Sequence, residues 1–167
     1  FQRHSTSKIT SAADLFNLST KGFRGEALAS IAAISHSELI TKTKSCDIGT
    51  FIRVEGNKII QNKSIVSNEG SSISVKNLFY NVPARRNFLK SNTAEIRHII
   101  DEFQRVALTS PEVAYSFYHN GQILFQLKPS SLKQRIINVF GSRVVSFALT
   151  PLLPMISMYI INRNKQF

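Results

Sequence analysis

The clearest potential for chemistry lies in a loop with two glycines directly before a predicted helix, Gly22-Phe23-Arg24-Gly25-Glu26-Ala27-Leu28. Glycine lets the backbone adopt positive φ values and come close to a ligand. The unpaired N–H groups and the positive dipole end of a helix start favour an anion such as phosphate. Arg24 can add a charge-assisted hydrogen bond. A two-glycine loop on its own is more often an ordinary helix start, so this hypothesis needs support from elsewhere in the chain.

A second candidate is a run of hydroxyls that ends in a cation, Ser5-Thr6-Ser7-Lys8. Thr6, Ser7 and Lys8 can hold phosphate oxygens or a metal-bound water. Taken alone, a solvated segment explains the run better. His4 has no acid or nucleophile close to it in the sequence, so we interpret it as a structural or surface histidine.

A third candidate is the basic stretch after Pro83, where Arg85, Arg86 and Lys90 can share one face of a short helix. Basic residues with aromatic neighbours are compatible with nucleic-acid contact. A helix anchored by Phe88, with solvated cations, fits the stretch equally well.

The composition narrows the classes of function. Lys and Arg total 21 against 10 Asp and Glu, and the net charge of +11 makes a polyanion the first partner to consider. The single cysteine, Cys46, excludes an intramolecular disulfide and a cysteine-rich zinc site. The sequence contains neither a P-loop nor a serine nucleophile elbow.

The elements that must position these residues follow from local signals. We expect a short helix at 14–18, with Ser11 as N-cap and Asp14 as the acidic residue three positions later, and another after Pro83. Longer helices are expected at 26–34 and 92–107, and the second has capping-box spacing from Asn92 to Glu95. A capped helix is expected at 132–140, and Gly141 ends it. Strands are predicted at 38–44, 50–55, 58–61, 72–78, 113–118 and 123–127, with hairpin turns at Gly56-Asn57 and Asn120-Gly121. In the helix at 132–140, the side chains expected to face inward are Leu132, Ile136, Val139 and Phe140.

This order of elements indicates an α+β fold, with helices on one face of a mainly antiparallel or mixed sheet. The best candidate for a domain boundary is Lys128-Pro129-Ser130-Ser131. Residues 144–161 carry no charge, but Pro151 and Pro154 interrupt them, so we expect buried strands there and no membrane span. The chain begins at Phe1 without an initiator Met, which predicts that it is an internal piece of a longer protein.

Three stretches together resemble MutL, the mismatch repair ATPase of the superfamily that also contains gyrase, the heat-shock chaperone and histidine kinases (GHKL). They are RHSTSKI at 3–9, GFRGEALAS at 22–30 and NLFYNVPARRNFL at 77–89. Their order and spacing fit as well as their residues, and the resemblance extends to about residue 141. The GFRGEAL run is the most specific stretch, because the lids of the other branches differ from it.

The resemblance implies part of a GHKL (Bergerat-type) α/β sandwich with helices on one face of a mixed sheet, over residues 1–128. The start of a ribosomal-S5-like transducer domain would follow over 129–167, where the tail is atypical. Residues 22–28 would be the ATP lid, with backbone amides that close on the β- and γ-phosphates. Thr6, Ser7 and Lys8 would lie beside the nucleotide at the other end of the lid. Gly70-Ser71-Ser72 stands in place of a Gly-Thr-Thr strand start by the adenine, and we expect the water contact there through Ser72.

In the family, ATP with Mg²⁺ orders the lid and drives a homodimer of N-terminal regions that encloses DNA. The dimer relays a signal from a mismatch-recognition protein of the MutS type, in the bacterial cytoplasm. The resemblance places the general-base Glu, the Mg²⁺-ligating Asn and the adenine-reading Asp upstream of Phe1, and Glu26 does not replace the base. We therefore do not expect the chain alone to hydrolyse ATP.

The sequence leaves two alternative functions to consider. The chain can be a basic nucleic-acid-binding module without nucleotide chemistry, in which Arg85 and Arg86 carry the binding and ATP has no effect. The amino-acid sequence of the lid (22–28) and that of residues 77–89 both disfavour a gyrase-like topoisomerase subunit.

Overall fold

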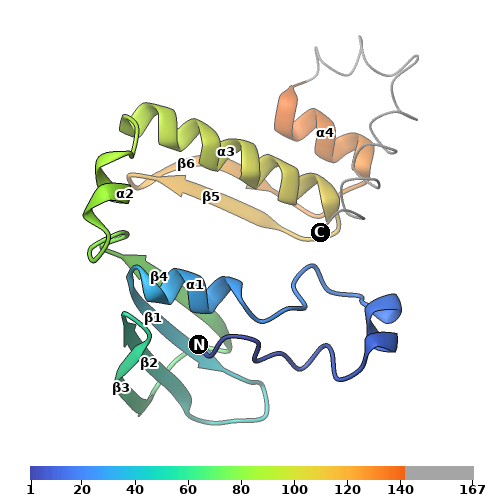
Figure 1. The fold of residues 1–167 in the computed structure, drawn as a ribbon. Helices are drawn as coiled ribbons and strands as arrows, with labels where there is room; N and C mark the ends of the chain where they lie inside the picture. The colour runs from blue at the N-terminus through green and yellow to red at the C-terminus, as the bar shows by residue number, and fades with distance from the viewer. Residues whose placement is uncertain (142–167) are drawn as a thin grey trace. The chain divides into compact units, whose positions relative to one another are not determined.

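The computed structural model describes residues 1–141, and these form two compact units (Figure 1). The first unit is Phe1–Leu89 and the second begins at Lys90. The domain boundary predicted at 128–131 stays a prediction, and elements on both sides of it lie in the second unit. The strands predicted within 144–161 lie outside the described residues. Within residues 1–141, no helix is both long and apolar enough to cross a membrane.

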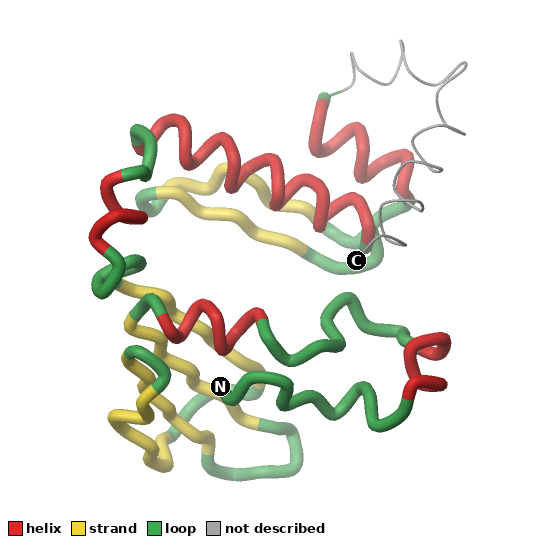
Figure 2. The backbone as a smooth tube through the Cα atoms, viewed as in Figure 1, coloured by secondary structure: helices red, strands yellow, loops and turns green. Residues whose placement is uncertain are grey.

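The first unit contains a helix-covered antiparallel sheet. Its elements are the 3₁₀ helix η1 (Ala12–Asn17), the helices α1 (Ala27–Ala33) and α2 (Pro83–Asn87), and the strands β1 (His36–Lys42), β2 (Gly49–Glu55), β3 (Lys58–Ile65) and β4 (Gly70–Lys76). The strand order is β3-β2-β1-β4, and every neighbouring pair is antiparallel. Each of these elements was predicted from the sequence, with shifted ends. Figure 2 shows that the long segment before α1 is loop apart from η1.

Small residues let α1 lie close to the sheet. Ala29 and Ala32 of this helix are buried, and α1 contacts β1 and β2. The hydroxyl of Ser35 donates to the carbonyl of Ile31 in α1 and shares a hydrogen bond of 2.9 Å with the hydroxyl of buried Ser37. Ser37 therefore marks the face of the sheet that α1 covers.

The opposite face of the sheet carries mostly polar and charged side chains, together with Ile40 and Phe51, as is common for the outer face of an antiparallel sheet. Glu38 lies on it and accepts a hydrogen bond of 2.7 Å from Lys76 on the neighbouring strand. This hydrogen bond from Lys76 lowers the pKa of the Glu38 carboxyl. The two faces thus differ in chemistry, and any strand residue can be assigned to one of them from its register.

The second unit packs two helices and a hairpin around an aromatic cluster. Its elements are α3 (Asn92–Thr109), β5 (Tyr115–His119), β6 (Gln122–Leu127) and α4 (Leu132–Phe140). The predicted Asn120-Gly121 turn is confirmed, and both residues have positive φ. The buried core consists of Ala107, Leu127 and Val139, and Phe103 stacks on Phe117 with a centroid distance of 4.9 Å.

The caps of the two helices differ in how well the sequence predicted them. Helix α4 begins and ends as predicted: Ser131 accepts from the backbone N–H of Gln134, and Gly141 follows with a φ of 87°. Helix α3 was predicted to be capped at Asn92, but Ser91 is the N-cap, and the Glu95 carboxylate accepts from the backbone N–H of Lys90. A serine hydroxyl one residue earlier satisfies the same orphan donors.

The inward face predicted for α4 is wrong at two positions. Leu132 and Phe140 are 40% and 45% exposed, whereas Arg135 is completely buried. One guanidinium nitrogen of Arg135 donates to the carbonyls of Pro111, Val113 and Lys128 at 2.6, 2.7 and 3.0 Å. A cation buried against carbonyls follows no hydrophobic periodicity, so helical spacing cannot predict it.

Candidate functional site

The two ends of the loop that precedes α1 lie against each other. Gly25 has a φ of +71°, and a Cβ added there would lie 2.5 Å from the carbonyl oxygen and 2.8 Å from the carbonyl carbon of Ser5. Only glycine fits this approach, because both the positive φ and the close backbone exclude a side chain. We call residues 5–25 the flap. Residues of the two sequence candidates, 5–8 and 22–28, therefore meet at the ends of the flap.

Glu26 is held by two basic side chains at this junction. Its carboxylate oxygens lie 3.2 Å from Nδ1 of His4 and 3.2 Å from Nε of Arg24. His4 adopts a φ of 60°, which places it in the left-handed region. Both carboxylate oxygens are therefore engaged, and the expectation that Glu26 is not a general base stays a prediction.

The other predicted ligands of the flap are polar and accessible. Thr6 is half-buried, and its hydroxyl accepts from the backbone N–H of Lys8 at 3.1 Å. Ser7 and Lys8 are exposed. Beyond the junction, Phe23 and Leu28 are half-buried, Gly22 has no neighbour within 4 Å of an added Cβ, and Ala27 opens α1.

The middle of the flap is organised by Asp14. Its carboxylate accepts from the backbone N–H groups of Thr10 and Ser11, each at 2.8 Å, and from the Thr10 hydroxyl at 2.9 Å. This is the acidic residue predicted near the start of the first short helix, which is confirmed as a 3₁₀ helix. These hydrogen bonds stabilise the charged form and lower the pKa of Asp14 to about 2.

We expect this Asp14 cap to be independent of pH across the neutral range. A lowered pKa contributes stability that is present above the ordinary value near 3.8 and is lost as the pH falls through about 2. The protection factors of the Thr10 and Ser11 amides, which are the exchange rates corrected for the intrinsic pH dependence, should therefore fall only below about pH 4. In Asp14→Asn, the protection of both amides should be lost at every pH. Exchange that is equally slow in wild type and variant would contradict this role.

Strand β4 presents its two serines to opposite faces of the sheet. In the antiparallel register, Ser71 is paired with Thr41, and their hydroxyls are 2.6 Å apart. Thr41 alternates with Ser37, so Ser71 lies on the face that α1 covers, whereas Ser72 pairs with Ile40 on the other face. The role predicted for Ser72 stays a prediction, but the register favours Ser71 for a contact on the α1 side. The sequence signal for this assignment is that side chains along a strand alternate between the two faces, so adjacent Ser71 and Ser72 must lie on opposite faces.

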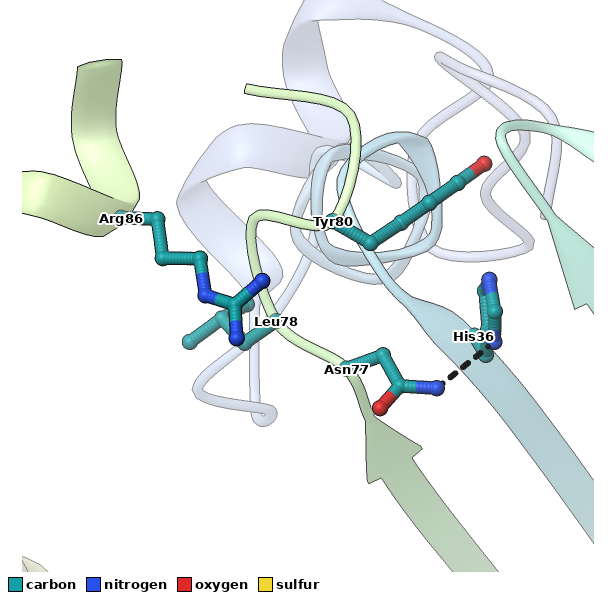
Figure 3. Close-up of a pocket in the computed structure, with 5 residues that line it drawn as sticks. All are labelled: His36, Asn77, Leu78, Tyr80 and Arg86. Atoms are coloured by element: carbon teal, nitrogen blue, oxygen red, sulfur yellow. Dashed lines mark hydrogen bonds between the residues drawn. The ribbon is translucent and has the colours of Figure 1, made fainter. Parts of the chain in front are cut away.

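The basic stretch is only partly helical. Helix α2 contains Arg85 and Arg86 but ends at Asn87, so Lys90 follows the helix and does not share its face. Arg86 lines a cleft with His36, Asn77, Leu78 and Tyr80 (Figure 3).

No metal centre is present among residues 1–141, where no group of three or more His, Cys, Asp or Glu side chains could hold a metal ion. The groups at and next to the flap junction are hydroxyls, the cations Arg24 and Lys8, a glycine backbone and the Glu26 carboxylate that pairs with Arg24. Such a donor set suits a polyphosphate.

Solved structures give the class of this fold. The chain matches the Aquifex aeolicus MutL ATPase domain complexed with ADP at a TM-score of 0.67 and 32% identity, over 78% of this chain and 52% of that one. It also matches the N-terminal domain of a DNA repair protein at a TM-score of 0.63 and 26% identity, over 74% and 39%. The chain thus has the fold of part of an ATPase domain of the GHKL class.

Sequence relatives give the family. The chain is 60% identical over 143 residues to the DNA mismatch repair protein MutL of Christiangramia forsetii and 57% identical over 143 residues to that of Flavobacterium psychrophilum. Each alignment covers 86% of this chain and 23% of the relative. The chain belongs to the MutL family, and it spans about a quarter of the length of these curated relatives. No protein-family model matches it.

Proposed function

We propose that this chain is the lid-bearing part of a mismatch repair ATPase and that its flap closes on ATP. The observation that carries the proposal is the contact of Gly25 with Ser5, which makes the flap a loop joined at its base. Thr6 follows Ser5 and Arg24 precedes Gly25, so this contact brings the two candidate phosphate-binding segments together. The solved neighbour at 32% identity is an ATPase domain complexed with ADP, which supports a nucleotide as the ligand.

In this proposal, the backbone amides of residues 22–28 donate to the terminal phosphates. Lys8 and Arg24 supply positive charge, and the Thr6 and Ser7 hydroxyls donate beside them. Glu26 is the acidic side chain at the junction, and its ion pair with Arg24 offsets its charge and so limits repulsion of the ligand. Mg²⁺ would neutralise the phosphates, and its protein ligands would come from outside the described residues.

The proposed role of the whole protein follows from its family. ATP binding would order the flap and promote a homodimer of N-terminal regions that encloses DNA. A mismatch-recognition protein of the MutS type would deliver the signal, and hydrolysis would reset the clamp. Support comes from relatives that are named DNA mismatch repair proteins at 51–60% identity and from the net charge of +11.

The nucleotide part of this proposal is tested with the two serines of β4. In the intact protein, Ser71→Ala should weaken ATP binding by about fivefold, which is the loss of one hydrogen bond of about 1 kcal/mol. Ser72→Ala is the matched control and should leave the affinity unchanged. Equilibrium titration with ATP gives both dissociation constants.

The outcomes separate cleanly. If wild-type protein binds no ATP, the proposed function is wrong. If Ser72→Ala weakens binding and Ser71→Ala does not, the nucleotide contact runs through Ser72, as the sequence resemblance implies, and the proposed contact through Ser71 is wrong.

A further inference from the structure

The cleft beside α2 is built by contacts that fix its walls. The segment 77–81 is fastened to the end of α1: the Phe79 N–H donates to the Ile34 carbonyl at 2.7 Å, and the Asn81 amide donates to the Ala33 carbonyl at 2.9 Å. Asn77 and Phe79 have φ values of 51° and 63°. A bulky residue such as Phe79 is held in this region only where its surroundings impose it, and such positions cluster at functional sites.

The cleft has a volume of about 170 Å³ and is lined by donors and an aromatic ring. The Asn77 amide nitrogen lies 3.0 Å from Nδ1 of His36, and in the tautomer in which Nδ1 accepts this hydrogen bond, the Nε2 N–H is a further donor. The Tyr80 ring packs edge-on against His36 at 4.4 Å, and its hydroxyl lies beside Gly56. Figure 3 shows the guanidinium of Arg86 reaching back toward Leu78 and Asn77.

Arg86 has no charge partner in this cleft. Within the part of the chain that the structure describes, its guanidinium makes no hydrogen bond or ion pair, and none of the lining residues is acidic. By contrast, Arg24, Arg53 and Arg105 each pair with a glutamate. A guanidinium without an acidic partner, next to a second hydrogen-bond donor, suits a phosphate, because it can donate two parallel hydrogen bonds to the phosphate oxygens.

We propose that this cleft seats one phosphodiester group of nucleic acid, held by the guanidinium of Arg86 with His36 and Asn77 as further donors. Leu78 and Tyr80 are 44% and 39% exposed and give the adjoining sugar or base an apolar and aromatic surface. That surface favours a nucleotide over the carboxylate of an acidic peptide. This proposal rests on the proposed function, because it takes DNA as the ligand. It assigns the phosphate contact to Arg86 and not to Arg85, which does not line the cleft.

The test measures DNA affinity of the intact protein against salt concentration for Arg86→Ala, Arg86→Lys and a control, Arg97→Ala, which removes an exposed cation from α3. Arg86→Ala should weaken binding about tenfold and reduce the slope of log K against log salt by about one, equally for different sequences. Arg86→Lys should keep the salt slope, because the positive charge remains, and should lose part of the affinity, because lysine cannot donate two parallel hydrogen bonds to one phosphate. Arg97→Ala should change neither.

Nucleotide titration keeps this proposal distinct from the proposed function, since Arg86→Ala should bind ATP like wild type. Unchanged DNA affinity and slope in Arg86→Ala would overturn the proposal, as would an equal loss in Arg97→Ala, which would mean diffuse attraction. A third arm adds inorganic phosphate to the DNA-free protein and follows the Nε–H resonance of Arg86 by NMR. A shift that saturates, combined with normal DNA affinity in Arg86→Ala, would assign the cleft to a free anion and refute the phosphodiester.

Discussion

Gly25→Ala in the intact protein is expected to reduce ATP turnover by about 100-fold or more, because a displacement of about 1 Å at a positioning loop has that effect. The new Cβ would lie 2.5 Å from the Ser5 carbonyl oxygen, a backbone atom that no rotamer change can move. The φ of +71° adds the strain of a left-handed residue with a side chain, about 1–2 kcal/mol. The base of the flap must then open.

Gly22→Ala is the matched control, because nothing lies within 4 Å of its added Cβ and its φ is not in the left-handed region. Its turnover should stay close to that of wild type, and DNA affinity without nucleotide should be nearly unchanged in both variants. Turnover assays and limited proteolysis of the flap with and without ATP give the comparison. Equal activity of Gly25→Ala and wild type would show that the contact with Ser5 is not used in closure.

The same pair of variants separates the two classes of function weighed from the sequence. A basic nucleic-acid module without nucleotide chemistry would lose nothing in Gly25→Ala, because its binding would depend on cations such as Arg85 and Arg86. A nucleotide-gated clamp would lose the effect of ATP on DNA binding and keep the affinity for DNA itself. Substitution of Gly25 therefore distinguishes these two classes of function better than substitution of any cation in the chain.

Local signals were sufficient for most of the fold. The turns at Gly56-Asn57 and Asn120-Gly121 require positive φ, which glycine and asparagine adopt at low cost, so their hairpins follow from the residues alone. Helix α4 lies between a serine cap and a glycine stop, and its bounds agree with the prediction. The ends of the flap were identified from the sequence because the two candidate phosphate-binding segments, 5–8 and 22–28, have the order and spacing that they have in the MutL family.

Features set by contacts between distant segments could not be predicted in the same way. The closeness of Gly25 to Ser5 depends on the path of the whole flap, and no local pattern contains it. The choice between Ser71 and Ser72 depends on which face α1 covers, which becomes visible only once β4 is paired with β1. The cleft of Arg86 needs the end of α1, the loop 77–81 and α2 together.

Arg135→Met should lower the free energy of opening of the β5–β6 hairpin by about 2–4 kcal/mol, because three carbonyl groups lose a buried charge-assisted donor at once. Methionine keeps most of the packing, so the loss reports the hydrogen bonds. The guanidinium also lies over the Tyr115 ring, 5.3 Å from its centroid, and this contact is lost too. Amide hydrogen exchange of β5 and β6 in the intact protein measures the effect.

Lys133→Met on the same helix is the control, since Lys133 is exposed, and its effect should stay within about 0.5 kcal/mol. The opposite result has a clear physical meaning. Nε and the other terminal nitrogen of Arg135 are buried without a partner among the described residues, so part of the cation is desolvated without compensation. If Arg135→Met proved as stable as wild type, that desolvation would equal the three hydrogen bonds, and Arg135 would be retained for something other than stability.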